Sequence, residues 1–363
     1  MIIQRRHESL AGVHAHTHAD EITIIKDEAL IARILKAYRL ALDLSLDIGD
    51  SQWRDYSGYY MAEILPIFRQ GDIKAAARIL RDPGAGMLYS GFDNSFAATL
   101  TDEHLPLYYN ETSLDGLARF AEVVGAIRLD NPESYTFRDL VVLEPEALLA
   151  GIARKTGWAF TIPNPFPNEH GVGTSRGVLS QRVPQALYQA WRMKKLLKGV
   201  SCPRVLEIGA GLGRAAYYAR ELGIFDYTIV DLPTTCVSQA YFLGRTLGDD
   251  CIVLHGESPD APENRVKIVP PDVFLNGTEH YDLVLNADSM TEMDISVARA
   301  YRDKIAASSS VFLSINHEAN AFRVTDLIEE HPGYEMISRY PCWMRAGYVE
   351  EIARVISPTR PKA

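Results

Sequence analysis

The chain has 363 residues, of which 47% are hydrophobic and 23% charged, as is ordinary for a globular protein. Its 47 acidic and 37 basic residues give a net charge of −10, which argues against a nucleic-acid partner, because such proteins present a basic face. The sequence contains no run of about 18 apolar residues, so no membrane-spanning helix is predicted. The first residues also lack the apolar segment of a secretory signal. We therefore expect a cytoplasmic protein with no membrane partner.

The sequence contains four cysteines, Cys202, Cys236, Cys251 and Cys342, and no C-x-x-C pair. This spacing predicts free thiols rather than a disulfide framework or a zinc site. The alternate histidines within residues 14–18 would face one way on a strand, but we interpret them as a solvated terminal segment.

The first 160 residues carry mostly helical patterns. Apolar residues in Lys26–Leu46 recur mainly at three- and four-residue steps, and Asp115–Leu129 repeats this spacing. Pro145 stands where a helix begins, and Gly157 where it ends. We therefore expect a helical N-terminal domain over residues 1–160, involved in substrate binding or oligomerisation.

Residues 161–183 are rich in proline and glycine, and they are long for a simple connection. One interpretation is a linker between domains. The other is a substrate-binding loop, with His170 and Arg176 as candidate substrate-binding residues.

From residue 184 the pattern changes to an alternation of strands and helices. Such alternation predicts an α/β domain with a parallel, Rossmann-like sheet covered by helices on both faces. The last two apolar segments predict an antiparallel hairpin at the sheet edge. The expected strands cover residues 204–208, 227–230, 251–254, 281–285 and 311–315, and the hairpin covers 334–339 and 348–355.

A glycine-rich segment joins the first of these strands to a helix at Val205–Arg214. The glycines at 209, 211 and 213 permit a tight turn and a close approach of backbone to a ligand. The helix that follows offers free N–H groups at its N-terminus. A dinucleotide, S-adenosylmethionine (SAM) or a purely structural turn would all fit this feature.

Two carboxylates and one arginine favour SAM. Glu207 lies two residues before Gly209, where it suits the amino group of methionine and would crowd a pyrophosphate. Arg214 stands where the dinucleotide pattern needs a small residue, although a shifted match over 211–216 keeps that alternative open. Asp231 closes the next strand and can accept ribose hydroxyls from either cofactor.

The adenine end is expected beyond the next strand, because ligands bind outside the carboxyl ends of strands. Glu257 is the candidate there, Asp272 is its rival, and a solvated loop acid is the plain alternative. The cofactor-binding residues that the sequence predicts are Glu207, Gly209, Ala210, Gly211, Gly213, Asp231, Leu232, Glu257, Asn286 and Ala287.

Residues 160–355 resemble the bacterial sugar O-methyltransferases found in antibiotic and surface-polysaccharide gene clusters. Two of the segments that carry the resemblance, 207–214 and 230–233, are general to class I methyltransferases. The more specific segments are Tyr281–Met293, Leu313–Asn316 and Trp343–Glu351. The resemblance implies a SAM fold, methyl transfer to a sugar hydroxyl and S-adenosylhomocysteine as the product.

Methyl transfer to a hydroxyl needs an aligned acceptor and a base for its proton. The candidate bases follow the fourth and fifth strands, and they are Asp288, Glu292 and His317. Asp288 and Glu292 would share one helix face at i and i+4, and a histidine titrates closest to neutral pH. Each has a plain alternative, as a helix N-cap, a first-turn acid and a surface loop residue respectively.

Three further residues are candidates for substrate binding. Asn316 lies at a strand end, and Trp343 and Arg345 lie in the hairpin loop, where they could stack on a sugar or pair with a phosphate. Core packing is the alternative for Trp343. No tight triplet of metal ligands is visible, so no metal site is predicted and a divalent ion is only a secondary option.

Two other functions fit the same motifs. One is methyl transfer to a non-sugar acceptor, such as a carboxylate, amine, phenol or carbon of a natural product. The other is a SAM-binding protein without chemistry. A homodimer is expected because dimers are the commonest oligomers.

Overall fold

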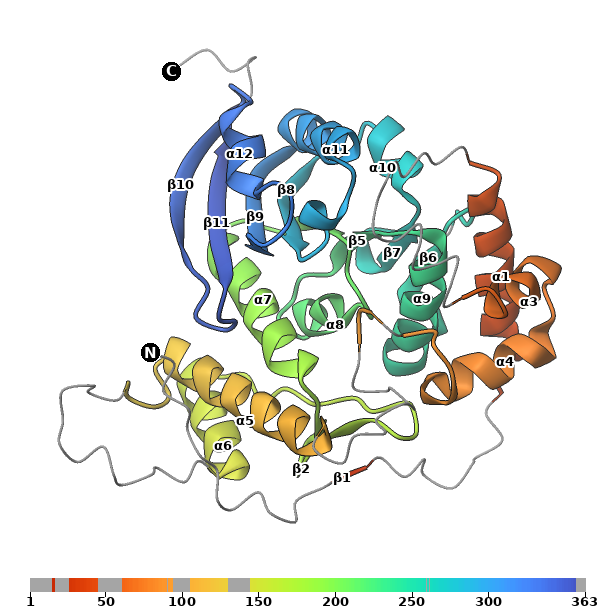
Figure 1. Cartoon of the computed structure of the whole chain (residues 1–363), viewed down its shortest axis with the longest axis horizontal. Helices are drawn as coiled ribbons and strands as arrows, with labels where there is room; N and C mark the ends of the chain where they lie inside the picture. The colour runs from red at the N-terminus through yellow and green to blue at the C-terminus, as the bar shows by residue number, and fades with distance from the viewer. Residues whose placement is uncertain are drawn as a thin grey trace. The chain divides into compact units, whose positions relative to one another are not determined.

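A computed structural model describes residues 15–16, 26–44, 61–89, 91–93, 105–129, 144–258, 260 and 262–356. The chain forms two compact units. The first comprises residues 1–24 and 81–190, and the second comprises residues 25–80 and 191–363. Figure 1 shows the helices and strands with the labels used below.

The first unit combines helices with a small antiparallel sheet. The helix α6 begins at Pro145 and ends before Gly157, which adopts a left-handed φ of 73°, as the sequence predicts. The segment predicted as a linker or loop contains a hairpin instead of irregular backbone alone. The elements of this unit are β1 (Ala15–His16), η2 (Pro83–Ala85), α5 (Leu105–Val123), α6 (Pro145–Thr156), β2 (His170–Thr174) and β3 (Gly177–Leu179).

The division between the units differs from the expected boundaries at 160 and 183. The helices α1 (Glu28–Leu42), α3 (Ile64–Gln70) and α4 (Ile73–Arg81) precede residue 82, yet residues 25–80 belong to the second unit. The reason is packing, because the apolar face of α1 is buried against α9 (Pro233–Leu247). Leu30 lies so close to Gly244 that a Cβ there would come within 2.8 Å of it.

The second unit is built on an eight-stranded sheet in the order β10-β11-β9-β8-β4-β5-β7-β6. The strand β11 runs antiparallel to both neighbours, and the other pairings are parallel. This confirms the predicted Rossmann-like sheet with a C-terminal antiparallel hairpin. The strands are β4 (Arg204–Ile208), β5 (Asp226–Val230), β6 (Ile252–Leu254), β7 (Val266–Val269), β8 (Tyr281–Ala287), β9 (Ser309–His317), β10 (Tyr334–Pro341) and β11 (Tyr348–Val355).

One strand was missing from the sequence-based prediction. The strand β7 is only four residues long, and it pairs with β5, whereas the predicted strand β6 lies beyond it at the sheet edge. Short strands with a charged residue in the middle, here Lys267, give a weak apolar signal. The strand end next to β5 is therefore Val269, and not Leu254.

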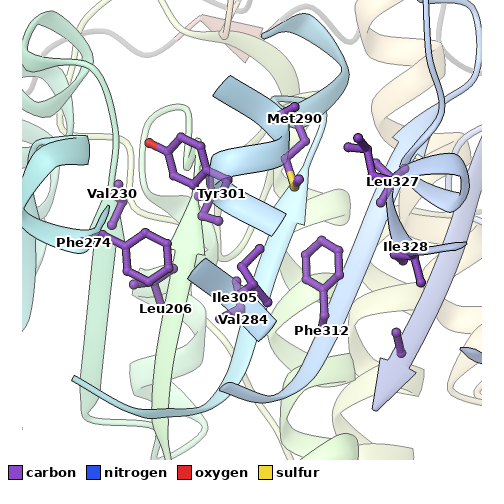
Figure 2. Packing of buried hydrophobic residues seen from close by; sticks show 14 of the residues in the cluster. Leu206, Val230, Phe274, Val284, Met290, Tyr301, Ile305, Phe312, Leu327 and Ile328 are labelled. Atoms are coloured by element: carbon purple, nitrogen blue, oxygen red, sulfur yellow. The ribbon is translucent and has the colours of Figure 1, made fainter. Parts of the chain in front are cut away.

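Helices cover both faces of this sheet, as expected. On one face, side chains from α11 and α12 pack with those of the strands around Leu206, Val284 and Phe312 (Figure 2). On the other face, Met193 of α7 contacts Tyr227 of β5. The helices of this unit not yet given are α7 (Arg182–Leu196, shared with the first unit), α8 (Arg214–Glu221), η4 (Asp249–Cys251), η5 (Pro262–Asn264), α10 (Pro271–Asn276), η6 (Met290–Glu292), α11 (Ile295–Ser308) and α12 (Val324–Glu329).

The order of the strands places a switch point at β4. The chain continues from β4 to β5 on one side of it and later adds β8 on the other side. In open α/β sheets, ligands bind in the crevice outside the carboxyl ends of the strands at such a point. Among the described residues, none of the helices is both long and apolar enough to cross a bilayer.

Candidate functional site

The loop after β4 has an unusual backbone. Gly209, Gly211 and Gly213 adopt left-handed φ values of 72°, 56° and 85°. A Cβ on Gly209 would also lie 2.2 Å from Oγ of Ser289, so no larger residue fits there. The loop thus needs glycine for its conformation as well as for the close approach of β8.

Asn286, at the end of β8, braces this junction. Its Nδ2 donates hydrogen bonds to the carbonyl of Ile208 at 3.0 Å and to Oγ of Ser289 at 2.5 Å. Ser289 Oγ in turn donates to the same carbonyl at 3.0 Å. The side chain of Asn286 was expected to bind cofactor, but it is fully buried and joins β8 to β4. Ala287, the last residue of β8, lies at this edge of the sheet.

Glu207 is buried beneath the glycine loop, with 3% of its surface exposed. Its Oε2 accepts a hydrogen bond of 2.8 Å from the hydroxyl of Tyr227, which is also buried. Burial, together with the nearby charge of Asp231, raises the pKa of Glu207 to about 7 even though the hydrogen bond from Tyr227 acts to lower it. A buried carboxyl of this kind is best stabilised by a cationic partner.

Asp231, at the end of β5, is bound by the loop. Its Oδ2 accepts hydrogen bonds from the backbone N–H of Ala210 at 3.0 Å and from Nε2 of Gln239 at 2.6 Å. Its Oδ1 accepts from the N–H of Leu232 at 2.8 Å. Burial raises the pKa of Asp231 to about 7, although the hydrogen bonds from these donors act to lower it.

Gln239 was not predicted as a site residue. It lies on α9, is fully buried, and also donates to the carbonyl of Gly211 at 3.0 Å. The available signal was a long polar side chain directly before the apolar run Ala240–Leu243 of the predicted helix at 238–247.

Glu257 does not lie where its predicted role requires. It forms a two-point ion pair with Arg33 of α1 at 2.8 and 3.0 Å and accepts the N–H of Leu254, which fastens α1 to the edge strand β6. Burial raises the pKa of Glu257, but the hydrogen bond and charge of Arg33 outweigh it and lower the pKa. The strand end that lies next to β5, where the sequence predicted Glu257, is instead the end of β7.

Asp272, the rival candidate, follows β7 directly and lies in the first turn of α10. Its Oδ2 is buried and has no hydrogen-bond partner among the described residues. The Asp231 backbone N–H donates to the carbonyl of Val269, so these two strand ends are adjacent. Asp272 therefore replaces Glu257 as the candidate for the adenine end.

A second cluster lies past β8 and β9, and we call Asp288, His317, Arg345 and Tyr348 the acceptor-end cluster. The Arg345 guanidinium pairs with the Asp288 carboxylate and donates to the Tyr348 hydroxyl. It also stacks 3.5 Å from the centre of the Tyr348 ring. That ring meets the ring of His317 edge-on at 5.4 Å, because the two residues are paired in register across β9 and β11.

Tyr348 was not predicted, because only the hairpin register brings it beside His317. The structure does bring together three of the predicted residues, Asp288, His317 and Arg345. They come from the residue after β8, the last residue of β9 and the loop before β11, and these strands end or begin at the same edge of the sheet.

The alternative interpretation of Asp288 as a helix N-cap is wrong. Asp294 caps α11, and its side chain accepts the N–H of Ser296. Asp288 instead has a left-handed φ of 70°, which places its carboxylate on Arg345. Glu292 lies in the single 3₁₀ turn η6, so the expected α-helical i and i+4 spacing with Asp288 does not form.

His317 is the last residue of β9. Its Nδ1 accepts a long hydrogen bond of 3.3 Å from the backbone N–H of Ala319, which favours the tautomer with the proton on Nε2. Among the described residues, none hydrogen-bonds Nε2. The histidine can therefore donate from Nε2 as it stands, and it becomes a base there after a tautomer exchange.

The other predicted residues have structural contacts. Asn316 is buried and donates to Asn286 at 2.8 Å. Arg176 donates to the carbonyls of Phe160 and Leu149 within the first unit. His170 begins β2, where it pairs with His16. Trp343 is 46% exposed in the hairpin loop.

The remaining expectations concern thiols and metals. All four cysteines are free thiols, as predicted. Within the described ranges, no group of three histidine, cysteine, aspartate or glutamate side chains is arranged to hold a metal ion. Of the histidines at 14–18, only the backbone of His16 is described, and the other two lie outside the described residues.

No protein-family model and no curated protein matches the sequence. Among solved structures, the glycopeptide N-methyltransferase MtfA in complex with SAM is similar over 47% of this chain and 94% of its own, with 15% identity and a TM-score of 0.36. The methyltransferase domain of bacterial CtHen1-C is similar over 47% and 98%, with 13% identity and a TM-score of 0.35. Thermoplasma acidophilum 1320 is similar over 49% and 86%, with 16% identity and a TM-score of 0.34. Each of these similarities covers about half of this chain.

Proposed function

We propose that this protein is a SAM-dependent methyltransferase that acts on a hydroxyl of a sugar or glycosylated metabolite. The observation that carries the proposal is the left-handed glycine loop at the switch point, which Asp231 binds from one side while Glu207 lies buried beneath it. When bound, SAM supplies an electrophilic methyl group on a sulfonium.

The two carboxyls at the ends of β4 and β5 support SAM over a dinucleotide. The ammonium group of the methionine moiety would compensate the buried Glu207, whereas a pyrophosphate would bring two more negative charges beside it. Asp231 would hold the ribose hydroxyls with its carboxylate, whose Oδ1 accepts the N–H of Leu232 and whose oxygens have several acceptor positions. Asp272 would accept from the adenine amino group with its buried Oδ2.

The charge of the acceptor-end cluster supports a neutral acceptor. Asp288 neutralises Arg345, so the cluster carries no net charge when His317 is neutral. A site for a carboxylate or phosphate would instead present a guanidinium that is free to bind it. The exposed Trp343 in the same hairpin loop offers an apolar face of the kind on which sugar rings stack.

Within this cluster, His317 is the best candidate base. The Asp288 carboxylate is engaged in its ion pair with Arg345, so accepting a proton there would disrupt that pair. His317 loses only the long bond from Ala319 when its proton moves to Nδ1, and Nε2 can then take the proton of the acceptor hydroxyl. Glu292 remains the alternative base, from its turn in η6.

Methyl transfer to a panel of acceptors tests this proposal. Purified protein with SAM should add one methyl group, read by mass spectrometry, to neutral glycosides in preference to uronic acids, amines and simple phenols. Transfer only to a carboxylate, amine or carbon would favour the non-sugar alternative. Tight SAM binding without turnover on any acceptor class would favour a non-catalytic SAM-binding protein.

The base assignment needs its own variants. His317→Gln should lower kcat by about 100-fold, in the range expected for loss of a general base, with Glu292→Gln as the comparison. Unchanged kcat in His317→Gln together with a large loss in Glu292→Gln would transfer the role to Glu292.

A further inference from the structure

Gln239 holds two parts of the candidate cofactor site at once. Its Nε2 donates to the Asp231 carboxylate at 2.6 Å and to the Gly211 carbonyl at 3.0 Å. Both partners are acceptors only, so the orientation of the amide follows from chemistry: the NH₂ group must face them. Its Oε1 is buried and has no hydrogen-bond partner among the described residues.

This arrangement is costly for a residue with no other role than packing. A buried amide oxygen without a partner destabilises the fold, and a leucine of similar size would avoid that cost on the apolar side of α9. What glutamine adds is the pair of donated bonds, one of them to a carboxylate. The two bonds join α9 to the loop after β4 and to Asp231 after β5, and they fix the position of the loop relative to Asp231.

We propose that Gln239 is a positioning residue for SAM, which fixes the Asp231 carboxylate and the middle of the glycine loop in the geometry that receives the ribose. The inference rests on the proposed function and adds to it a residue that touches no reacting atom. Gln239 acts on the ribose end only, so its loss should weaken ligands that carry ribose hydroxyls and spare those that lack them.

Titration of S-adenosylhomocysteine and its 2′,3′-dideoxy analogue into the full chain tests this directly. In Gln239→Leu we expect the affinity for S-adenosylhomocysteine to fall about 10- to 100-fold, the value of one bond to a charged group. The affinity for the dideoxy analogue should change less than threefold. Ser238→Ala, a buried neighbour on the same helix, is the matched control and should leave both affinities unchanged.

Gln239→Glu gives a second readout that general loosening of the fold would not produce. This substitution places a second carboxylate beside Asp231 in place of the donor. The affinity for S-adenosylhomocysteine should therefore recover as the pH falls from 8 to 6, because one proton can then bridge the two carboxylates. The wild type should show the opposite trend, because Asp231 and Glu207 lose their charge over that interval. The titratable groups that face Asp231 are Glu207 of β4, Cys236 of α9 and Tyr301 of α11.

The possible failures can be told apart. Equal weakening of both ligands in Gln239→Leu, or parallel pH profiles in Gln239→Glu and wild type, would overturn the positioning role while leaving SAM as the cofactor. A wild-type protein that binds neither S-adenosylhomocysteine nor SAM would overturn the proposed function itself.

Discussion

The two ends of the candidate site are built in different ways. Apart from Asp272, the backbone and side-chain groups of the cofactor end lie within a stretch of 33 residues, from Glu207 to Gln239. The acceptor-end cluster draws Asp288 from the residue after β8, His317 from β9 and Tyr348 from the antiparallel strand β11. A site made of a loop between adjacent strands leaves a short sequence signature, whereas a site made across a sheet edge leaves scattered residues.

Electrostatics separate the two ends as well. At the cofactor end, Glu207 and Asp231 are carboxyls without a cationic partner among the described residues, and burial raises the pKa of each to about 7. At the acceptor end, Asp288 is paired with Arg345. The first end thus favours a cationic ligand, and the second fits the neutral acceptor that we propose.

The largest effect is expected from Gly209→Ala at the cofactor end. The new Cβ would meet Ser289 in a left-handed backbone, so the free energy of unfolding should fall by about 3 kcal/mol and SAM binding should be lost. Gly157→Ala is the matched control, with φ of 73° and open space around its Cβ, and should cost only about 1 kcal/mol. Chemical denaturation measures both, and equal costs would show that close packing at Gly209 is unimportant.

Arg345→Met should affect the acceptor end alone. We expect kcat to fall about 100-fold, because Asp288 and Tyr348 lose their common partner, while SAM affinity changes less than threefold. Arg354→Met, which removes an exposed ion pair with Glu335 on the same hairpin, should leave both unchanged. A large loss of SAM affinity in Arg345→Met would break the separation between the two ends.

Glu207→Gln should weaken SAM binding about 10- to 100-fold and make it less dependent on pH. The same substitution should raise the stability of the fold at neutral and higher pH. A carboxyl whose pKa is raised from 4.5 to about 7 stabilises the fold fully below pH 4.5 and loses that contribution as the pH rises through 7. As the pH rises from 5 to 8, the free energy of unfolding of the variant should therefore increase by about 2–3 kcal/mol relative to that of the wild type. Thermal unfolding at each pH measures this difference. A variant that is less stable than wild type at pH 8 would contradict burial as the cause of the raised pKa.

The smallest effects distinguish Asp272 from Glu257. Asp272→Asn should weaken SAM binding about tenfold, since it alters an acceptor at the adenine end. Glu257→Gln should leave affinity unchanged and lower stability by only about 0.5–1 kcal/mol, because its ion pair with Arg33 is partly exposed and screened. The reverse ranking in a titration would restore Glu257 to the cofactor site.

The sequence was sufficient for the sheet and for the glycine loop, because both depend on local patterns. The expected segments match every strand of the sheet except β7 to within two residues at each end, and Glu207 and Asp231 were selected because they stand at the ends of the first two strands. It missed β7 because four residues carry too little periodicity, and that error moved the adenine end to Glu257. Gln239 could not be assigned because its contact with Gly211 spans 28 residues, and Tyr348 could not be assigned because only strand register brings it beside His317.

Calorimetric titration of the wild-type protein tests the identity of the cofactor most directly. S-adenosylhomocysteine should bind at one site per chain, more tightly at pH 8 than at pH 6, as Glu207 and Asp231 ionise. NAD should not compete with it. Binding of NAD with no binding of S-adenosylhomocysteine would contradict the central claim.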